Sequence, residues 1–511
     1  MIPISNSTKQ LKIAAIISYS VIIFNILAGF VYTPWMISVI GISDYGLYVL
    51  ATSFLAYFVL DFGLGQSVTR FIAKYRAENS EENIYNFLGL TFKLYLIFAF
   101  IILITLIVIY CLIDKIFIQL TAVEVKNFKI LFVLVGLFSI FSFPFKPIDG
   151  IISGYELFVP LQICNLLNKV LTIALVILAL FFGLGLYSLV FSNIIAGIIL
   201  IIVKLIIIKK NTTIKVNYKY INKSMAKNIF SFSGWMTVNI ILYNMLVSIQ
   251  PTILGMFSGS NQISIFSIGM VLFGYTNTFV SALSGLFLPK VSRIVKMEDA
   301  KEKVEELTIK VGRIQLTIIG AIVVIFTSIG KNFIELWVGK FFNNSYIVAL
   351  LLILPLLITS TQTILRTMIV AQGKVKLEAI GLIFSAITSV TVSLILSNGM
   401  GAVGAALGSS IGIIFSYIIW MNIIYHKVLG VSIYRFFKEC HFKFSVPIIV
   451  SILIGYLFKI IIPSENIIEF IIKATLVGSV YVLLIWMFAL NNYEKNIIIS
   501  PLKLVHRMIL K

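Results

Sequence analysis

The sequence predicts an all-α polytopic membrane protein with about 14 transmembrane helices. Hydrophobic residues make up 60% of the 511 residues and charged residues only 12%, whereas soluble domains carry roughly a quarter charged residues. The apolar residues form continuous runs of about 18 to 25 residues, the length at which a helix crosses a bilayer. Strands of a membrane barrel would alternate apolar and polar side chains, so the runs predict helices.

The predicted spans are separated by short segments rich in turn-forming residues. Examples are residues 41–46, 258–262, 397–401 and 463–466, where glycine, asparagine, serine or proline interrupts the apolar pattern. We predict spans at 13–40, 47–69, 87–111, 129–153, 160–182, 186–208, 229–256, 263–288, 314–337, 346–370, 378–397, 401–425, 444–462 and 467–490.

Lysine and arginine are distributed unevenly between alternate loops. With the N-terminus in the cytoplasm, the cytoplasmic segments hold about 30 of the 40 basic residues and the opposite loops hold about seven. This asymmetry predicts that both termini are cytoplasmic. The net charge of +20 is therefore attributed to topology and to contact with anionic membrane lipids, and no nucleic-acid partner is expected.

The longest predicted cytoplasmic segments lie near 209–228 and 289–313. Both are basic, and the second intersperses acidic residues among its lysines. This charge pattern predicts a surface helix that acts as a solvated connector.

The chain shows an internal repeat at an offset of about 217 residues, consistent with the length of a six-helix unit. Gly41 corresponds to Gly259, and Asn25 corresponds to Asn244. Two parallel six-helix copies are typical of transporters that enclose a central site. We therefore predict an N-terminal lobe at 1–210, a linker at 211–228, a C-terminal lobe at 229–427, and two appended helices with a basic tail at 428–511.

No motif in the sequence supports catalysis. Gly330 and Lys331 lack the glycine spacing of a phosphate-binding loop, and the three histidines are scattered. Cys111, Cys164 and Cys440 are too far apart in sequence to indicate a disulfide framework or a metal cluster. We expect a protein without catalytic residues, cofactor or metal.

Ionisable residues inside spans are the candidate functional residues, because a charge at mid-bilayer normally faces a cavity or a partner. Asp61 and Lys169 are the deepest, and Lys146, Asp149 and Arg366 lie nearer the cytoplasmic face. Asp61 is compatible with a structural hydrogen bond between helices, and Lys169 with snorkelling to the headgroups.

Polar and small residues inside the spans are the second set of candidates. Asn25 and Asn244, at corresponding depths, are compatible with hydrogen bonding to a substrate or between helices. Pro144 is expected to break its helix. Gly404 and Gly408 belong to a small-residue stripe that predicts close helix packing.

Three segments resemble the bacterial polysaccharide flippases, which export O-antigen and capsule repeat units and belong to the multidrug/oligosaccharidyl-lipid/polysaccharide superfamily. They are GISDYGLY at 41–48, LDFGLG at 60–65 and RFIAK at 70–74. The plan of two six-helix lobes and two further helices matches the resemblance over the whole chain.

The resemblance implies movement of an undecaprenyl-pyrophosphate-linked oligosaccharide to the outer leaflet of the bacterial cytoplasmic membrane, through a cationic cavity and with coupling to Na⁺ or H⁺. Asp61 and Arg70 carry over from the motif by position. The substrate-binding candidates are Lys169, Lys146, Arg366, Arg70, Asn25 and Asn244, and the ion-coupling candidates are Asp61 and Asp149.

The expected partners are the lipid-linked oligosaccharide, membrane lipids, and the polymerase and chain-length machinery of polysaccharide assembly. Two alternatives stay open at this point. One is a multidrug/cation antiporter of the same superfamily, and the other is a non-transporting scaffold of a polysaccharide assembly complex.

Overall fold

The computed structural model describes residues 4–57, 64–284, 291, 293–294, 297–461 and 466–496. Within these ranges the regular secondary structure is entirely helical, which confirms the predicted class. Among the described residues, twelve helices are long and apolar enough to cross a membrane, or thirteen when a bent pair is counted as one span. The predicted count of fourteen is not confirmed. The second predicted span, 47–69, contains residues 58–63, which lie outside the described residues.

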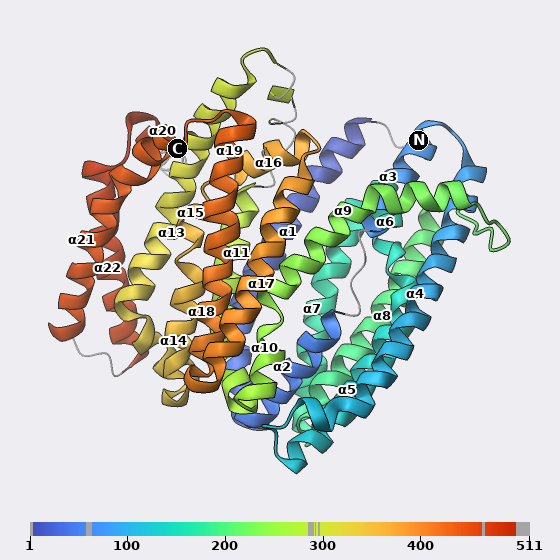
Figure 1. Ribbon diagram of the computed structural model, residues 1–511, viewed down its shortest axis with the longest axis horizontal. Helices are drawn as coiled ribbons and strands as arrows, with labels where there is room; N and C mark the ends of the chain where they lie inside the picture. Colours follow the sequence, from blue (N-terminus) through green and yellow to red (C-terminus); the bar gives the residue numbers. More distant parts are fainter. Residues whose placement is uncertain are drawn as a thin grey trace, which may run out of the picture. The chain divides into compact units, whose positions relative to one another are not determined.

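The helices follow the predicted spans closely (Figure 1). The first half of the chain contains α1 (Ile4–Ile40), α2 (Ile42–Ala56), α3 (Leu64–Ala77), α4 (Glu81–Ile116), α5 (Ala122–Ser142), η1 (Phe143–Phe145), α6 (Pro147–Gly154), α7 (Phe158–Phe181), α8 (Tyr187–Asn211), α9 (Lys223–Val247) and α10 (Gln250–Phe257). The second half contains α11 (Ser260–Ser284), α13 (Ala300–Val338), η3 (Lys340–Phe342), α14 (Asn343–Ile353), α15 (Leu356–Thr359), α16 (Thr363–Ala371), α17 (Val375–Met400), α18 (Ala402–Ile413), η4 (Ile414–Trp420), α19 (Met421–Leu429), α20 (Ile433–Phe436), η5 (Phe437–Phe442), α21 (Lys443–Ile461) and α22 (Ile467–Phe488).

Contacts between residues divide the chain into two compact units. The first unit comprises Met1–Ser267 and Ala386–Ser409, and the second comprises Ile268–Ser385 and Ser410–Lys511. The lobes at 1–210 and 229–427, which follow from the sequence repeat, stay a prediction.

One broken helix occurs where the sequence predicts a break, and a second occurs in a span that the sequence predicts to be continuous. The fourth predicted span is interrupted by η1, which contains Pro144, and continues as α6 from Pro147. Proline has no backbone N–H and clashes with the preceding turn, so the α-helical hydrogen bonds cannot continue through it. The seventh predicted span is also divided, because α9 and α10 meet at an angle of 40°.

The turns before α2 and α11 are built in the same way. Gly41 and Gly259 have positive φ angles of 92° and 83°, which glycine adopts without steric penalty. Ser43 and Ser260, which follow these glycines, lie 3.0 Å apart and both donate hydrogen bonds to the carboxylate of Glu124. One carboxylate therefore joins two turns through serines that are 217 residues apart in the sequence.

Helix α13 differs from the prediction at its N-terminal end. It runs without interruption for 39 residues, about 58 Å at the rise of an α-helix, which exceeds the roughly 30 Å of bilayer hydrocarbon. The charged residues between 300 and 313, predicted to form a separate surface helix, are the first turns of this helix. The apolar run covers only the part of α13 that is predicted to lie in lipid. Hydropathy therefore predicts a start for α13 that is C-terminal to the observed one.

Close packing of α17 against α18 confirms the predicted role of the glycine stripe. A Cβ atom at Gly408 would lie 2.7 Å from the carbonyl oxygen of Ser389 and closer still to Ser393 Oγ. A Cβ at Gly404 would lie 2.5 Å from the carbonyl oxygen of Leu396. Small residues let helix backbones approach within the membrane, where packing contributes much of the association energy.

The second unit joins α13 to the last two membrane helices, α21 and α22, which lie beside it (Figure 1). Arg313 of α13 is 4% exposed and forms an ion pair with Glu494, which is 5% exposed. The guanidinium donates to both Glu494 oxygens at 2.5 and 2.8 Å and to the carbonyl oxygens of Glu439 and Ala489. A buried arginine is tolerable when its donors are used in this way.

Gly408→Ala is expected to destabilise the protein by about 1–3 kcal/mol, because the added methyl group overpacks the α17–α18 contact. Thermal unfolding in detergent micelles measures this loss. Gly399→Ala is the matched control, since a Cβ at Gly399 meets no heavy atom within 4 Å. Equal melting temperatures for the two variants would contradict the packing role.

Arg313→Ala is expected to destabilise the protein by about 3–5 kcal/mol, because it leaves the Glu494 carboxylate buried without its partner. Replacing both residues, as Arg313→Met with Glu494→Leu, is expected to recover much of that loss. Lys303→Ala serves as a control, because Lys303 forms an exposed pair with Asp299. If the double variant is less stable than Arg313→Ala in the same unfolding assay, the ion-pair account is wrong.

Candidate functional site

The first unit contains an ion pair between two of its membrane helices. Lys204 Nζ of α8 lies 2.6 Å from Asp149 Oδ1 of α6. The Lys204 side chain is 17% exposed and the Asp149 side chain is 55% exposed. The Asp149 side chain is therefore exposed, whereas the Lys204 side chain is largely buried.

Close contact between α3 and α6 fixes the position of Asp149. Gly150 and Gly154 lie one turn apart on α6 and face α3, where Cβ atoms would come within 2.6 Å of the Gly65 carbonyl oxygen and 2.8 Å of Ile72. Arg76 of α3 donates to the Gly154 carbonyl oxygen at 2.8 Å. A short helix that follows a proline break is thereby held rigidly against its neighbour.

Two predicted substrate-binding residues lie on the same pair of helices. Lys146 immediately precedes α6 and is half-buried, with its ammonium 5.8 Å from the centre of the Phe143 ring. Arg70 lies on α3 and is exposed. Arg70, Lys146 and the Lys204–Asp149 pair thus belong to one group of contacting helices.

Lys169 and Asn25 lie on a second pair of contacting helices in the first unit. Lys169 is exposed on α7, and Asn25 is half-buried on α1, which packs against α7. The C-terminal ends of these helices meet at Trp35 and Phe181, whose ring centres are 6.2 Å apart.

The Asn244 amide forms hydrogen bonds near the C-terminal end of α9. Its Nδ2 donates to the carbonyl oxygen of Ile240 at 2.8 Å, and the Ser248 hydroxyl lies 3.5 Å from its Oδ1. The amide therefore bonds within its own helix, directly before the bend between α9 and α10. Its predicted role in substrate binding stays a prediction.

Arg366 belongs to a polar cluster in the second unit. Its guanidinium lies 2.7 Å from the Glu378 carboxylate and 5.4 Å from the centre of the Tyr417 ring. Glu378 is 3% exposed, whereas the Arg366 side chain is 51% exposed. Tyr417 lies in η4, a π-helical segment, and such segments are frequent at functional sites.

Asp61 lies outside the described residues, so its predicted coupling role stays a prediction. Among the described residues, no three histidine, cysteine or acidic side chains come together as a metal-binding group.

Two charged residues of these clusters were missed by the sequence prediction. Lys204 lies near the end of the predicted span 186–208, where a lysine is ordinarily attributed to snorkelling. Glu378 is the first residue of the predicted span 378–397. In the sequence, each of these two residues is only an ionisable side chain near the boundary of a predicted span. The fold shows that each has a charged partner.

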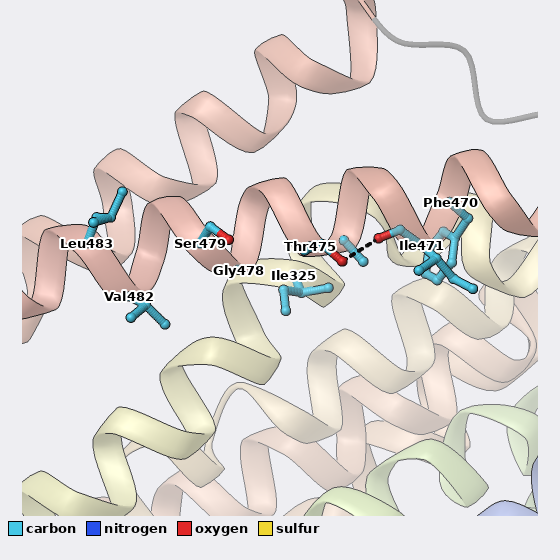
Figure 2. A pocket seen from close by; sticks show the side chains of 9 residues that line it. Ile325, Phe470, Ile471, Thr475, Gly478, Ser479, Val482 and Leu483 are labelled. Carbon is cyan, nitrogen blue, oxygen red and sulfur yellow. Dashed lines mark hydrogen bonds between the residues drawn. The ribbon is translucent and has the colours of Figure 1, made fainter. Parts of the chain in front are cut away.

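An apolar groove of about 690 Å³ lies in the second unit along α22 (Figure 2). Ile325 of α13 forms one wall, and residues from Phe470 to Leu483 form the other. The Thr475 hydroxyl donates to the Ile471 carbonyl oxygen at 2.8 Å within α22, so it requires no partner from the groove. This lining suits hydrocarbon chains.

Comparison with known sequences gives a match to a family model and a relative. A family model described as "Polysaccharide biosynthesis protein" matches residues 12–295, more than half of the chain. A putative O-antigen transporter of Shigella flexneri is 22% identical over 377 residues, which cover 73% of this chain and 88% of that protein.

Solved structures share the fold. The lipid II flippase MurJ, in an inward closed conformation, has a TM-score of 0.70 and 16% identity, covering 92% of this chain and 98% of its own. An inward-facing multidrug resistance transporter of the MATE family, in the MOP superfamily, has a TM-score of 0.62 and 15% identity, covering 81% and 99%.

The Lys204–Asp149 pair is expected to stabilise the first unit by a coupling energy of about 0.5–3 kcal/mol, because its two members are in direct contact and its lysine is more buried than that of the control pair below. A double-mutant cycle with Lys204→Ala and Asp149→Ala, followed by thermal unfolding in detergent, measures it. The Lys129–Asp114 pair, whose side chains are 27% and 60% exposed, is the matched control and is expected to give about 0.2–1 kcal/mol. Strict additivity at Lys204 and Asp149 would show that the contact contributes nothing.

Proposed function

The chain belongs to the polysaccharide biosynthesis protein family, and from this premise we propose that it is a flippase for lipid-linked oligosaccharides. Its cargo is an undecaprenyl-pyrophosphate-linked repeat unit, which it moves from the inner to the outer leaflet of the bacterial cytoplasmic membrane. The match to the family model over residues 12–295 is the observation that carries this proposal.

The charges of the first unit support an anionic cargo. Lys93, Lys146, Lys169 and Lys204 lie within predicted spans of the first unit, together with one described acid, Asp149, which pairs with Lys204. A basic lining raises the local concentration of a pyrophosphate and lowers that of a cation. Lys146 and Lys169 are the proposed contacts for the headgroup, with Arg70 at the end of the same path.

The direction of transport is favoured by the membrane potential. Moving one negative charge outward across an inside-negative membrane is favoured by about 2.3 kcal/mol per 100 mV. In this proposal Asp61 binds the Na⁺ or H⁺ that returns the empty carrier. Asp149 is the second coupling candidate, and a bound cation there would compete with the Lys204 ammonium.

A multidrug/cation antiporter is the second candidate, favoured by the fold shared with the MATE family transporter. A cationic drug would require an uncompensated acid along its path. The Lys204 ammonium already neutralises Asp149, which makes the first unit a weaker site for such a cargo.

Reconstituted liposomes test the proposal. Transfer of a fluorescent undecaprenyl-pyrophosphate-linked oligosaccharide between leaflets is the expected result. Efflux of ethidium without lipid transfer would establish the antiporter, and absence of both activities would favour a scaffold for polysaccharide assembly.

Asp61→Asn is expected to lower the rate of lipid transfer at least about tenfold, equivalent to about 1.4 kcal/mol in the rate-limiting barrier, and to abolish its dependence on the ion gradient. Asp299→Asn is the control, because Asp299 forms an exposed pair with Lys303. The liposome assay is run with and without a Na⁺ or H⁺ gradient. If Asp61→Asn transport still responds to the gradient, this residue is not the coupling site.

A further inference from the structure

We propose that a polar stripe on α7 binds the sugar part of the cargo. The stripe consists of Gln162, Asn165, Asn168, Lys169 and Thr172. This inference rests on the proposed flippase function and extends it, because it assigns oligosaccharide recognition to side chains outside the flippase motif.

The members of the stripe share one face of the helix. At 3.6 residues per turn they occupy an arc of about 120° and a length of about 15 Å. The Asn165 amide donates to Gln162 Oε1 at 3.3 Å, which places these two side chains together. Asn165, Asn168 and Lys169 are exposed, and Gln162 and Thr172 are partly exposed.

The opposite face of α7 is exposed but apolar. Ile163 and Val170 are 50% and 42% exposed, and they lie about half a turn from Asn165 and Asn168. This face suits contact with lipid. Amide groups and an ammonium facing hydrocarbon would be left without partners, which is strongly unfavourable. The stripe therefore faces water.

Exposure of the polar face ends partway along the helix. Val176 and Leu180 continue the same side of α7 toward Phe181, and they are only 1% and 6% exposed. Within the first unit this side is thus accessible near the Phe158 end, which is predicted to be cytoplasmic, and covered near the other end. A hydrated helix face that is exposed at one end and buried at the other is the geometry expected of a site that takes up cargo from one side of the membrane.

The chemistry of the stripe matches a glycan. An amide side chain offers two N–H donors and a carbonyl acceptor, so it pairs with sugar hydroxyls in either direction. Only Lys169 carries a charge, which suits the anionic link between sugar and lipid. The repeat offset of about 217 residues places α7 on α17, whose serines at 389, 393 and 397 are fully buried. The polar exposed face therefore distinguishes α7 from α17.

Cysteine accessibility tests the inference. The three native cysteines are replaced by serine, and single cysteines are introduced as Asn165→Cys or Asn168→Cys. Ile163→Cys and Val170→Cys are matched controls on the apolar face. A membrane-impermeant maleimide is applied to inside-out vesicles, alone or with lipid-linked oligosaccharide extracted from the source cells. The same extract after mild acid hydrolysis, which separates the glycan from the lipid phosphate, tests whether the intact molecule is required.

We expect both stripe variants to react about tenfold or more faster than the controls, because maleimide needs a hydrated thiolate. The intact extract is expected to slow labelling of the stripe at least about fivefold, and the hydrolysed extract to have less effect. Equal labelling of both faces, no labelling of the stripe, or no protection by the intact extract would each overturn the inference.

A second pair of variants covers the case in which the cysteine proteins do not fold. Asn165→Ala with Asn168→Ala is expected to lower transfer of the oligosaccharide lipid at least about tenfold, while Ile163→Ala with Val170→Ala leaves it within about twofold. Equal effects of the two pairs would contradict sugar binding. If the stripe is protected but reconstituted protein transfers no lipid, the flippase proposal fails and the binding site remains.

Discussion

Hydrocarbon solvates no polar group, and the rest of the structure depends on this constraint. Backbone groups satisfy it by forming helices. Side chains satisfy it by pairing: Lys204 with Asp149, and the Asn244 amide with its own helix. A polar side chain that does neither must face water. Charged side chains that pair within the protein therefore have a structural role, whereas those that face water are available to bind a cargo.

The same constraint sets how the helices hold together. Lipid tails are as apolar as the side chains that touch them, so association relies on close packing and internal hydrogen bonds. Gly408 against Ser389 and Gly150 against Gly65 bring backbones into contact. Polar links then fix particular elements, as Glu124 does for the turns at Ser43 and Ser260. Packing brings elements together, and a few polar contacts determine their register.

The sequence predicted the helical class and the positions of most spans, because hydropathy reports directly which residues need lipid. It also located the break at Pro144 and the packing glycines of α18. The error in the predicted start of α13 also follows from the use of hydropathy, because the charged turns beyond the apolar run carry no hydropathy signal. Partners such as Asp149 for Lys204 and Glu378 for Arg366 are set by which helices become neighbours. A single sequence contains no record of that proximity.

The polar stripe of α7 shows why depth alone is a poor guide to function. Lys169 is a candidate functional residue because its predicted position is deep in the membrane, yet a lone lysine is compatible with snorkelling. Its meaning changes when Asn165 and Asn168 are found on the same face, exposed, with apolar Ile163 and Val170 exposed on the opposite face. Snorkelling accounts for one long side chain but not for neutral amides, which have no reason to face lipid. Two exposed faces of opposite character on one helix therefore require two different solvents, and in the proposed function the second solvent is the hydrated path along which the cargo moves.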